Sequence, residues 1–291
     1  NPYLDETEGA AEVLVVDDMS TGKPENLPRD AHTHELDIGD AGFVELARSF
    51  KPHVISHCAA QASVPRSVAK PALDAEINIV GGINVGRAAE ASGCGHLIYV
   101  NTGGALYGPP DYLPCDEDHP IRPISPYGLS KWTLERYLHL LLPPRIRLSV
   151  LRLANVYGPR QDPEGESGVV SIFGRRMLRG ESVTVHGDGE QTRDYVFVRD
   201  VTEAHQLAGR APESLTVNVG TGLAVTVNQL FGLMAEEAGY SLPPVHGDPR
   251  PADVKHIVLD ASRARRLLGW SATTQLQDGL RQTLGWLRTQ V

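Results

Sequence analysis

Short apolar runs alternate with longer amphipathic stretches in the first half of this chain, and this rhythm restricts the fold strongly. The runs are rich in β-branched residues and lack polar alternation, as strands covered on both faces do. They lie at residues 13–16, 53–57, 97–100 and 148–152. Helical patterns lie between them, at residues 40–49, 73–91 and 126–142. The order strand, helix, strand predicts an α/β fold built on a parallel sheet.

The sequence pattern changes beyond Asn155, where glycine and proline residues indicate a loop-rich segment. We expect a helix over 169–178, a strand and helix over 195–208, and a strand over 217–219. The chain shows no internal repeat and no low-complexity linker. Any second lobe must therefore be interleaved with the first in sequence.

Composition excludes several classes of protein. The 291 residues carry a formal charge of −9 and no long basic run, which argues against a nucleic-acid surface. The three cysteines are widely spaced, so we expect reduced thiols and no metal site. No apolar run reaches the ~18 residues of a membrane helix, and no signal-peptide pattern opens the sequence. We expect a cytoplasmic protein that binds neither membrane nor nucleic acid.

The segment from Ser125 to Lys131 carries the strongest chemical signal. Ser125 can cap a helix whose first turn contains Pro126, and Tyr127 and Lys131 then share one helix face. A neighbouring ammonium favours the phenolate form of tyrosine, which can take a proton from a substrate hydroxyl. Tyrosine and lysine also meet at this spacing by chance on exposed helices. The strand end at Thr102 and Gly103, about 25 residues upstream, favours the functional interpretation.

Asp17 closes the strand at residues 13–16 and matches the acid that binds an adenosine ribose 2′-hydroxyl. It would repel a 2′-phosphate, and we expect no arginine nearby to compensate, so NAD is favoured over NADP. A strand-end acid that merely begins a turn is nearly as common. Only 16 residues precede Asp17, and they contain no glycine-rich phosphate loop. We favour a first strand and loop that lie outside this sequence over a protein that has lost them.

Arg193 and Arg250 are the best phosphate-binding candidates in the second half, because a guanidinium can donate two hydrogen bonds to a phosphate. A solvated surface arginine is the alternative for each, and spacing does not decide between them.

Taken together, these segments resemble the extended short-chain dehydrogenase/reductase family, and within it the UDP-glucose 4-epimerase-like enzymes. The resemblance runs from about Glu12 to Trp286. Its motifs are Asp17-Asp18 with 20–22, the segment 57–61, the segment 102–108, Ser125-Pro126-Tyr127 with Lys131, and the segments 151–159, 187–194 and 218–222.

The resemblance implies a Rossmann-like, doubly wound sheet, with residues 1–155 and 195–222 binding NAD and residues 156–194 and 223–291 forming a smaller lobe for the nucleotide sugar. It implies Tyr127 as catalytic base, Lys131 as its electrostatic partner and Thr102 as the hydroxyl beside the sugar, where many relatives place Ser or Thr at the position of Gly103. The implied cofactor contacts are Asp17, Asp18, Asp37, Ile38, Ala59, Ala60, Gln61, Asn78, Tyr127 and Lys131. The implied substrate contacts are Gly103, Asn155, Val169, Arg193, Arg250, Asp253 and Ile257.

The same resemblance bears on the reaction and the substrate. Dehydratase relatives carry an acid pair after the threonine, whereas this chain has Gly104 and Ala105, which favours C4 epimerisation. Ile257 stands where relatives admit or exclude N-acetyl groups, so plain UDP-hexoses are expected. UDP-glucuronate remains the main rival, through Arg66, although a solvated Arg66 is the more common case. A dehydratase, decarboxylase or reductase, and a nucleotide-sensing or scaffold protein, stay open. A homodimer is implied.

Overall fold

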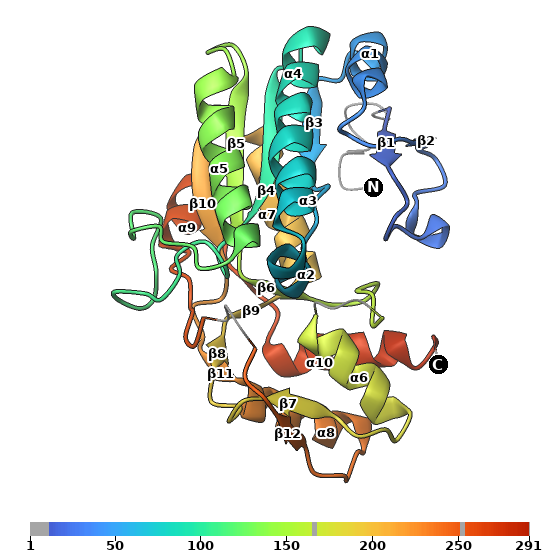
Figure 1. Cartoon of the computed structure of the whole chain (residues 1–291), viewed down its shortest axis with the longest axis vertical. Coiled ribbons are helices and arrows are strands. Elements are labelled where there is room, and N and C mark those ends of the chain that lie inside the picture. Colours follow the sequence, from blue (N-terminus) through green and yellow to red (C-terminus); the bar gives the residue numbers. More distant parts are fainter. Residues whose placement is uncertain (1–11, 165–167, 251–253, 291) are drawn as a thin grey trace.

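The computed structural model describes residues 12–164, 168–250 and 254–290 (Figure 1). Within them, one parallel sheet has the order β10 (Leu215–Val219), β5 (Arg147–Leu153), β4 (His96–Thr102) and β3 (Val54–His57). The three expected strands at 53–57, 97–100 and 148–152 are therefore confirmed, as is the strand at 217–219. The carboxyl ends of these strands meet at one edge, where parallel sheets bind ligands.

The strand β1 (Leu14–Asp17) differs from expectation in its neighbours. It pairs in parallel with β2 (His32–Glu35) as a separate small sheet, with no ladder joining it to β3 among the described residues. All four residues of β1 are half-buried, so this strand is not covered on both faces. Val16 nevertheless packs in the same apolar cluster as Ile55 of β3, which keeps the two sheets in contact.

Helices cover both faces of the sheet, which confirms the doubly wound arrangement. Leu97 and Tyr99 face one side and Ile98 faces the other, as the two-residue period of a strand requires. One side packs against α1 (Ala41–Phe50), α4 (Gly82–Ser92) and α5 (Pro126–Leu141). The opposite side packs against α7 (Val198–Arg210) and α9 (Ser262–Leu268).

The helical stretch expected at 73–91 is built from three pieces. It begins with α3 (Pro71–Ala75), continues as a π-helical turn over Glu76–Gly81, and ends as α4. A shorter helix, α2 (Val64–Ala69), precedes it. The wider turn carries Asn78 into the interior, and π-turns are often found at functional sites. The long apolar pattern predicts a helix over these residues, but it does not predict the change from α-helical to π-helical hydrogen bonds.

A third apolar cluster lies beyond the carboxyl edge of the sheet, in the lower half of Figure 1. The parallel pair β6 (Asn155–Tyr157) and β9 (Tyr195–Phe197) lies between it and the sheet. The cluster packs α6 (Val169–Leu178), which has the expected bounds, against α8 (Val227–Ala238) and α10 (Leu276–Leu287). Smaller elements complete this part: the pair β7 (Thr184–His186) with β12 (Val245–Gly247) and the pair β8 (Thr192–Arg193) with β11 (Val225–Thr226).

No helix in the described parts of the chain is long and apolar enough to cross a membrane. Over the same residues, His, Cys, Asp and Glu side chains form no group suited to hold a metal ion.

Candidate active site

The first turn of α5 brings Tyr127 to the carboxyl end of β4. The Ser125 hydroxyl accepts a hydrogen bond from the Gly128 amide at 3.1 Å, which caps the helix as expected. Gly128 lies against the carbonyl oxygen of Ala105, and a side chain at this position would collide with it. A glycine therefore lets α5 approach the loop that follows Thr102.

Thr102 and Tyr127 meet through their side chains. Burial raises the pKa of Tyr127 to about 12, and the Asp74 carboxylate also raises this pKa. A hydrogen bond from Thr102 lowers it, but this effect is smaller than that of burial. The Thr102 hydroxyl also accepts a hydrogen bond from the Ala105 amide at 3.2 Å, which fixes its position. The phenol thus needs further positive charge before it can act as a base near neutral pH.

Lys131 lies one turn further along α5 and is 4% exposed. Its ammonium donates a hydrogen bond to the carbonyl oxygen of Val100 at 2.8 Å and lies 4.5 Å from the centre of the Tyr99 ring. Burial lowers the pKa of Lys131 to about 8, although Cys58 and Asp74 act to raise it. The ammonium therefore lies against the backbone of β4, next to the residues that end this strand.

The loop after β3 carries Ala59, Ala60 and Gln61. The Gln61 amide donates to Asn78 Oδ1 at 2.9 Å, and Asn78 Nδ2 donates back to the Gln61 carbonyl at 3.0 Å. Asn78 thus supports this loop, as expected. Sequence analysis missed Asp74, whose Oδ1 accepts hydrogen bonds from both side-chain amides. Its place three residues after Pro71 carried no signal, because an acid in the first turn of a helix is common.

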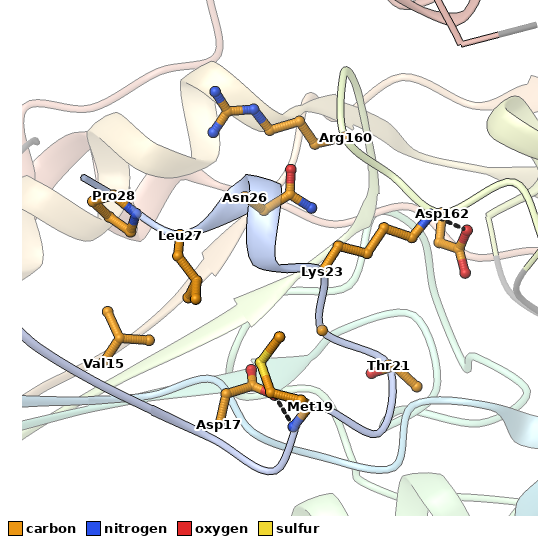
Figure 2. Close-up of a pocket in the computed structure, with 11 residues that line it drawn as sticks. Val15, Asp17, Met19, Thr21, Lys23, Asn26, Leu27, Pro28, Arg160 and Asp162 are labelled. Carbon is orange, nitrogen blue, oxygen red and sulfur yellow. Dashed lines mark hydrogen bonds and ion pairs between the residues drawn. The ribbon is translucent and has the colours of Figure 1, made fainter. Parts of the chain in front are cut away.

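A cavity of about 270 Å³ opens beside Asp17 (Figure 2). Asp17 Oδ1 accepts a hydrogen bond from the Met19 amide at 2.8 Å, which orients the carboxylate at the strand end. Arg160 and Lys23 line the same cavity, and Lys23 pairs with Asp162 at 3.1 Å. The expectation that no arginine lies near Asp17 is therefore wrong, because the loop after β6 folds back over the end of β1.

The other predicted cofactor residues near this end hold local turns. Asp18 is exposed and accepts hydrogen bonds from the amide and hydroxyl of Ser20. Asp37, just after β2, accepts one from the Gly39 amide at 2.7 Å. Ile38 is buried, and its carbonyl accepts a hydrogen bond from Asn84 at 2.6 Å.

Gly103 and Asn155 lie next to the catalytic candidates. A side chain at Gly103 would collide with the end of Leu259, which is fully buried, and would come 3.3 Å from the Arg152 carbonyl. A side chain at position 103 would therefore require Leu259 to shift. Asn155 Oδ1 would lie 3.4 Å from a Cβ at Gly104, so Asn155 flanks the same loop.

The remaining substrate candidates are distributed over several separate elements of the fold. Val169 begins α6 and is half-buried, Arg193 donates to the carbonyls of Thr192 and Lys255, and Arg250 is exposed. Ile257 is 1% exposed and packs in the apolar cluster that contains Leu259. Asp253 lies outside the described residues, and Arg66 is exposed on α2.

Asp194, directly after Arg193, ties this region together. It is 1% exposed and accepts hydrogen bonds from the amide and hydroxyl of Thr221 at 2.9 and 2.6 Å, from the Gly222 amide at 3.1 Å and from the Leu259 amide at 3.3 Å. Burial raises the pKa of Asp194 despite these bonds. The segment that carries Arg193 is thereby fixed to the loop after β10.

Comparison with known proteins gives a consistent result. The chain is 40% identical over 285 residues to a UDP-glucose 4-epimerase of Mycolicibacterium smegmatis, covering 96% of this chain and 91% of that protein. A crystal structure of the Thermotoga maritima UDP-glucose 4-epimerase with UDP-glucose matches at a TM-score of 0.93 and 45% identity, covering 96% of this chain and 91% of that one. The Thermus thermophilus UDP-glucose 4-epimerase in complex with NAD matches at 0.90 and 41%, covering 96% and 92%. Residues 3–220 match the model of the NAD dependent epimerase/dehydratase family, and the chain belongs to that family.

Proposed function

We propose that this protein catalyses epimerisation at C4 of a UDP-sugar and interconverts UDP-glucose and UDP-galactose through a transient 4-keto sugar. The observation that carries the proposal is the contact between the half-buried side chains of Thr102 and Tyr127, one helical turn from the buried Lys131. Gly104 and Ala105 follow, where dehydratase relatives carry an acid pair. Proton and hydride transfer at a single carbon needs only Thr102, Tyr127 and Lys131, and no additional acid pair.

The described residues fit NAD. Asp17 presents a carboxylate to the 270 Å³ cavity, where it can accept hydrogen bonds from a ribose diol. Ile38 is buried and is proposed to lie beside adenine, as the resemblance implies. Ala59, Ala60 and Gln61 would border the nicotinamide half, and Lys131 would bind its ribose. When bound, NAD would supply the hydride acceptor and donor for C4, as a resident cofactor.

The side chains of this chain then have distinct tasks. Tyr127 removes the proton from the C4 hydroxyl and later gives it back. Thr102 donates to the phenolate and holds the sugar hydroxyl in line. The Lys131 ammonium stabilises the phenolate through the electric field, which opposes the upward pKa shift that burial imposes on Tyr127.

We assign the nucleotide sugar to residues 156–194 and 223–291, of which α9 packs on the main sheet, and NAD to residues 1–155 and 195–222. Arg193 and Arg250 are proposed to bind the diphosphate, with Asn155, Val169 and Asp253 beside the uridine and phosphate. Gly103 and Ile257 are proposed to border the hexose. The names of the relatives support a UDP-hexose.

A side-by-side assay of UDP-galactose, UDP-N-acetylgalactosamine and UDP-glucuronate tests this function. We expect the highest kcat/KM with UDP-galactose, by roughly 10–200-fold, because apolar packing discriminates modestly. A higher kcat/KM for either of the other two sugars would change the substrate assignment but not the proposed epimerase reaction. No turnover with any of them, and no NAD bound to the purified protein, would favour a sensing or scaffold protein.

We also propose a homodimer, formed by the helical region 71–92 and α5 of each copy. These elements expose a row of large apolar side chains: Val80, Leu129, Tyr137, Leu140 and Leu141. Leu140, in the last turn of α5, is 79% exposed, and exposed apolar side chains that gather into a patch mark an interaction surface. The free cysteines and the use of NAD support a reducing, cytoplasmic location.

Light scattering at micromolar concentration is the measurement for this assembly. We expect a dimer mass for the protein as it stands and a monomer for Leu140→Glu, because a charge cannot be buried in an apolar helix pair. Leu223→Glu, at an exposed leucine on the loop after β10, is the matched control and should remain a dimer. A monomer for the unaltered protein would contradict the proposal.

A further inference from the structure

Asp74 is a buried carboxylate with an unusual set of contacts. It is 1% exposed on α3. Its Oδ1 accepts hydrogen bonds from Gln61 Nε2 at 2.7 Å and from Asn78 Nδ2 at 3.1 Å. Its Oδ2 is equally buried but has no hydrogen-bond partner among the described residues. Burying a carboxylate oxygen without a hydrogen bond costs free energy, so the position of Asp74 needs a structural or functional reason.

The hydrogen bonds of Asp74 continue into the catalytic helix. Asn78 Nδ2 also lies 3.1 Å from the Ser130 hydroxyl, and that hydroxyl donates to the Tyr127 carbonyl at 3.0 Å. One connected set of bonds therefore joins the loop of Gln61 to the turn of α5 between Tyr127 and Lys131. A change at Asp74 would act on both elements.

The groups around Lys131 differ in charge. His57 and Cys58 lie at the end of β3, Asp74 on α3, Tyr99 on β4, and Tyr127 and Glu135 on α5 itself. Burial lowers the pKa of His57 to about 3, and desolvation raises the pKa of the Cys58 thiol, although the residue is exposed. Burial also raises the pKa values of Tyr99 and Tyr127. These four side chains are therefore neutral near pH 7.

Two carboxylates remain near the buried ammonium. Glu135 is committed to Arg152, with 2.6 Å between Glu135 Oε1 and the nearer guanidinium nitrogen. Asp74 has no ion-pair partner of that kind among the described residues, and it raises the pKa of Lys131 against the effect of burial. Asp74 is thus the carboxylate without an ion-pair partner that acts to raise the pKa of Lys131, after the larger effect of Cys58.

We propose that Asp74 is a positioning residue for the reaction: it keeps the buried Lys131 ammonium protonated and fixes the Gln61 loop against the helix that carries Tyr127. It touches neither substrate nor cofactor and acts through Lys131 and Gln61. The inference rests on the proposed function only in that Lys131 assists Tyr127.

Asp74→Asn separates charge from shape. Asparagine keeps an oxygen for the hydrogen bonds from Gln61 and Asn78 and loses only the charge. We expect the midpoint at which Lys131 titrates to fall from about 8 by roughly one pH unit. NMR of ¹³Cε-labelled lysine reports this midpoint without turnover, with the Lys131 signal assigned by Lys131→Arg. The alkaline limb of the kcat profile should move in the same direction, with little change in KM.

Three further variants complete the test. Asp74→Glu keeps the charge and should keep the midpoint close to 8. Asp74→Ala removes the hydrogen bonds as well and should lower kcat beyond the asparagine variant at every pH. Asp200→Asn is the matched control, because Asp200 is also 1% exposed and accepts hydrogen bonds from Thr273 and Thr274. It should lower stability without moving the Lys131 midpoint.

An unchanged Lys131 midpoint in Asp74→Asn overturns the inference. If that variant does not fold, a lowered midpoint in Asp74→Glu overturns it instead. A protein that shows the expected midpoints but no epimerase activity would refute the proposed function and leave the role of Asp74 intact.

Discussion

The phenol of Tyr127 and the ammonium of Lys131 share one face of α5 but make different contacts. Tyr127 bonds to Thr102, whereas Lys131 bonds to the backbone of β4. We expect Lys131 to act on the phenol through space, because a charge acts strongly where the effective dielectric is low. Under the proposed mechanism, catalysis depends on the charge of Lys131 more than on its hydrogen bonding.

Tyr127→Phe tests the base directly. It removes one oxygen and little contact area, so we expect kcat to fall by roughly 10²–10⁴-fold while UDP-sugar affinity stays nearly unchanged. Steady-state kinetics and calorimetric titration give the two quantities. Tyr112→Phe, at an exposed tyrosine on a loop, should behave like the unaltered protein. Wild-type turnover in Tyr127→Phe would end the assignment.

Asp17→Asn tests the choice of cofactor. Asparagine keeps an acceptor for the Met19 amide but no longer repels a 2′-phosphate, and Arg160 and Lys23 already line the cavity. We expect the preference for NAD over NADP to fall by about tenfold, which corresponds to ~1.4 kcal/mol. Equilibrium binding of both dinucleotides measures it. Adding Arg160→Ala should reverse the gain, and an unchanged preference would show that the carboxylate does not discriminate.

Among the helices and strands, the sequence predicted the features that depend on local patterns of residues. The bounds of α6 and the cap of α5 followed from periodicity and from Ser125, because both depend on neighbours in sequence. The sequence did not predict the π-turn or the contacts of Asp74. They depend on Gln61 and Asn78 meeting in space across 17 residues, which no local pattern encodes.

Gly128→Ala tests how closely α5 must approach the loop after β4. The added methyl would collide with the Ala105 carbonyl, a backbone atom that cannot rotate away. We expect a loss of roughly 1–3 kcal/mol in the free energy of unfolding, together with a lower kcat, because Tyr127 would move from Thr102. Urea unfolding and kinetics measure both.

Gly232→Ala is the matched control for that substitution. Gly232 lies within α8 with open space around its Cα, so alanine should raise stability by about 0.4–1 kcal/mol through the unfolded state. Equal effects at the two glycines would mean that helix propensity, and not the approach to Ala105, decides the outcome.

For the whole molecule, buried strands with no polar alternation predicted the parallel sheet well, and the family resemblance implied its doubly wound arrangement. The same reasoning placed residues 13–16 among them, but β1 is half-buried and pairs only with β2 among the described strands. Apolar sequence alone cannot distinguish a central strand from one beside a break in the hydrogen-bond ladder. Likewise, Ile257 was predicted beside the sugar and packs in the core, so its contact with substrate stays a prediction.

The buried His57 and the half-buried His205 predict how stability depends on pH. Burial lowers the pKa of His57 to about 3 and that of His205 to about 4. Unfolded histidine titrates near ~6.5, so below that pH the unfolded state binds more protons than the native state. Stability is then full above pH ~6.5 and falls with decreasing pH, by up to about 1.4 kcal/mol per pH unit for each group, until the folded pKa is reached.

Urea unfolding at pH 7, 6 and 5 measures this slope. His205→Gln should reduce it, whereas His34→Gln, at an exposed position on β2, should not. Comparing variants matters, because the raised pKa of Asp194 acts in the opposite direction. Identical slopes in all three proteins would exclude His205 as a contributor.

The four hydrogen bonds of Asp194 also set an order in time. The Leu259 amide that contacts this carboxylate is synthesised 65 residues later. At ~5–20 residues per second, the ribosome needs roughly 3–13 s to cover that distance. During this interval the donors of Thr221 and Gly222, 27 and 28 residues after Asp194, become available first, and the contact with the Leu259 amide comes last. The nascent chain therefore contains every strand of the four-stranded sheet before the last hydrogen bond of Asp194 can form.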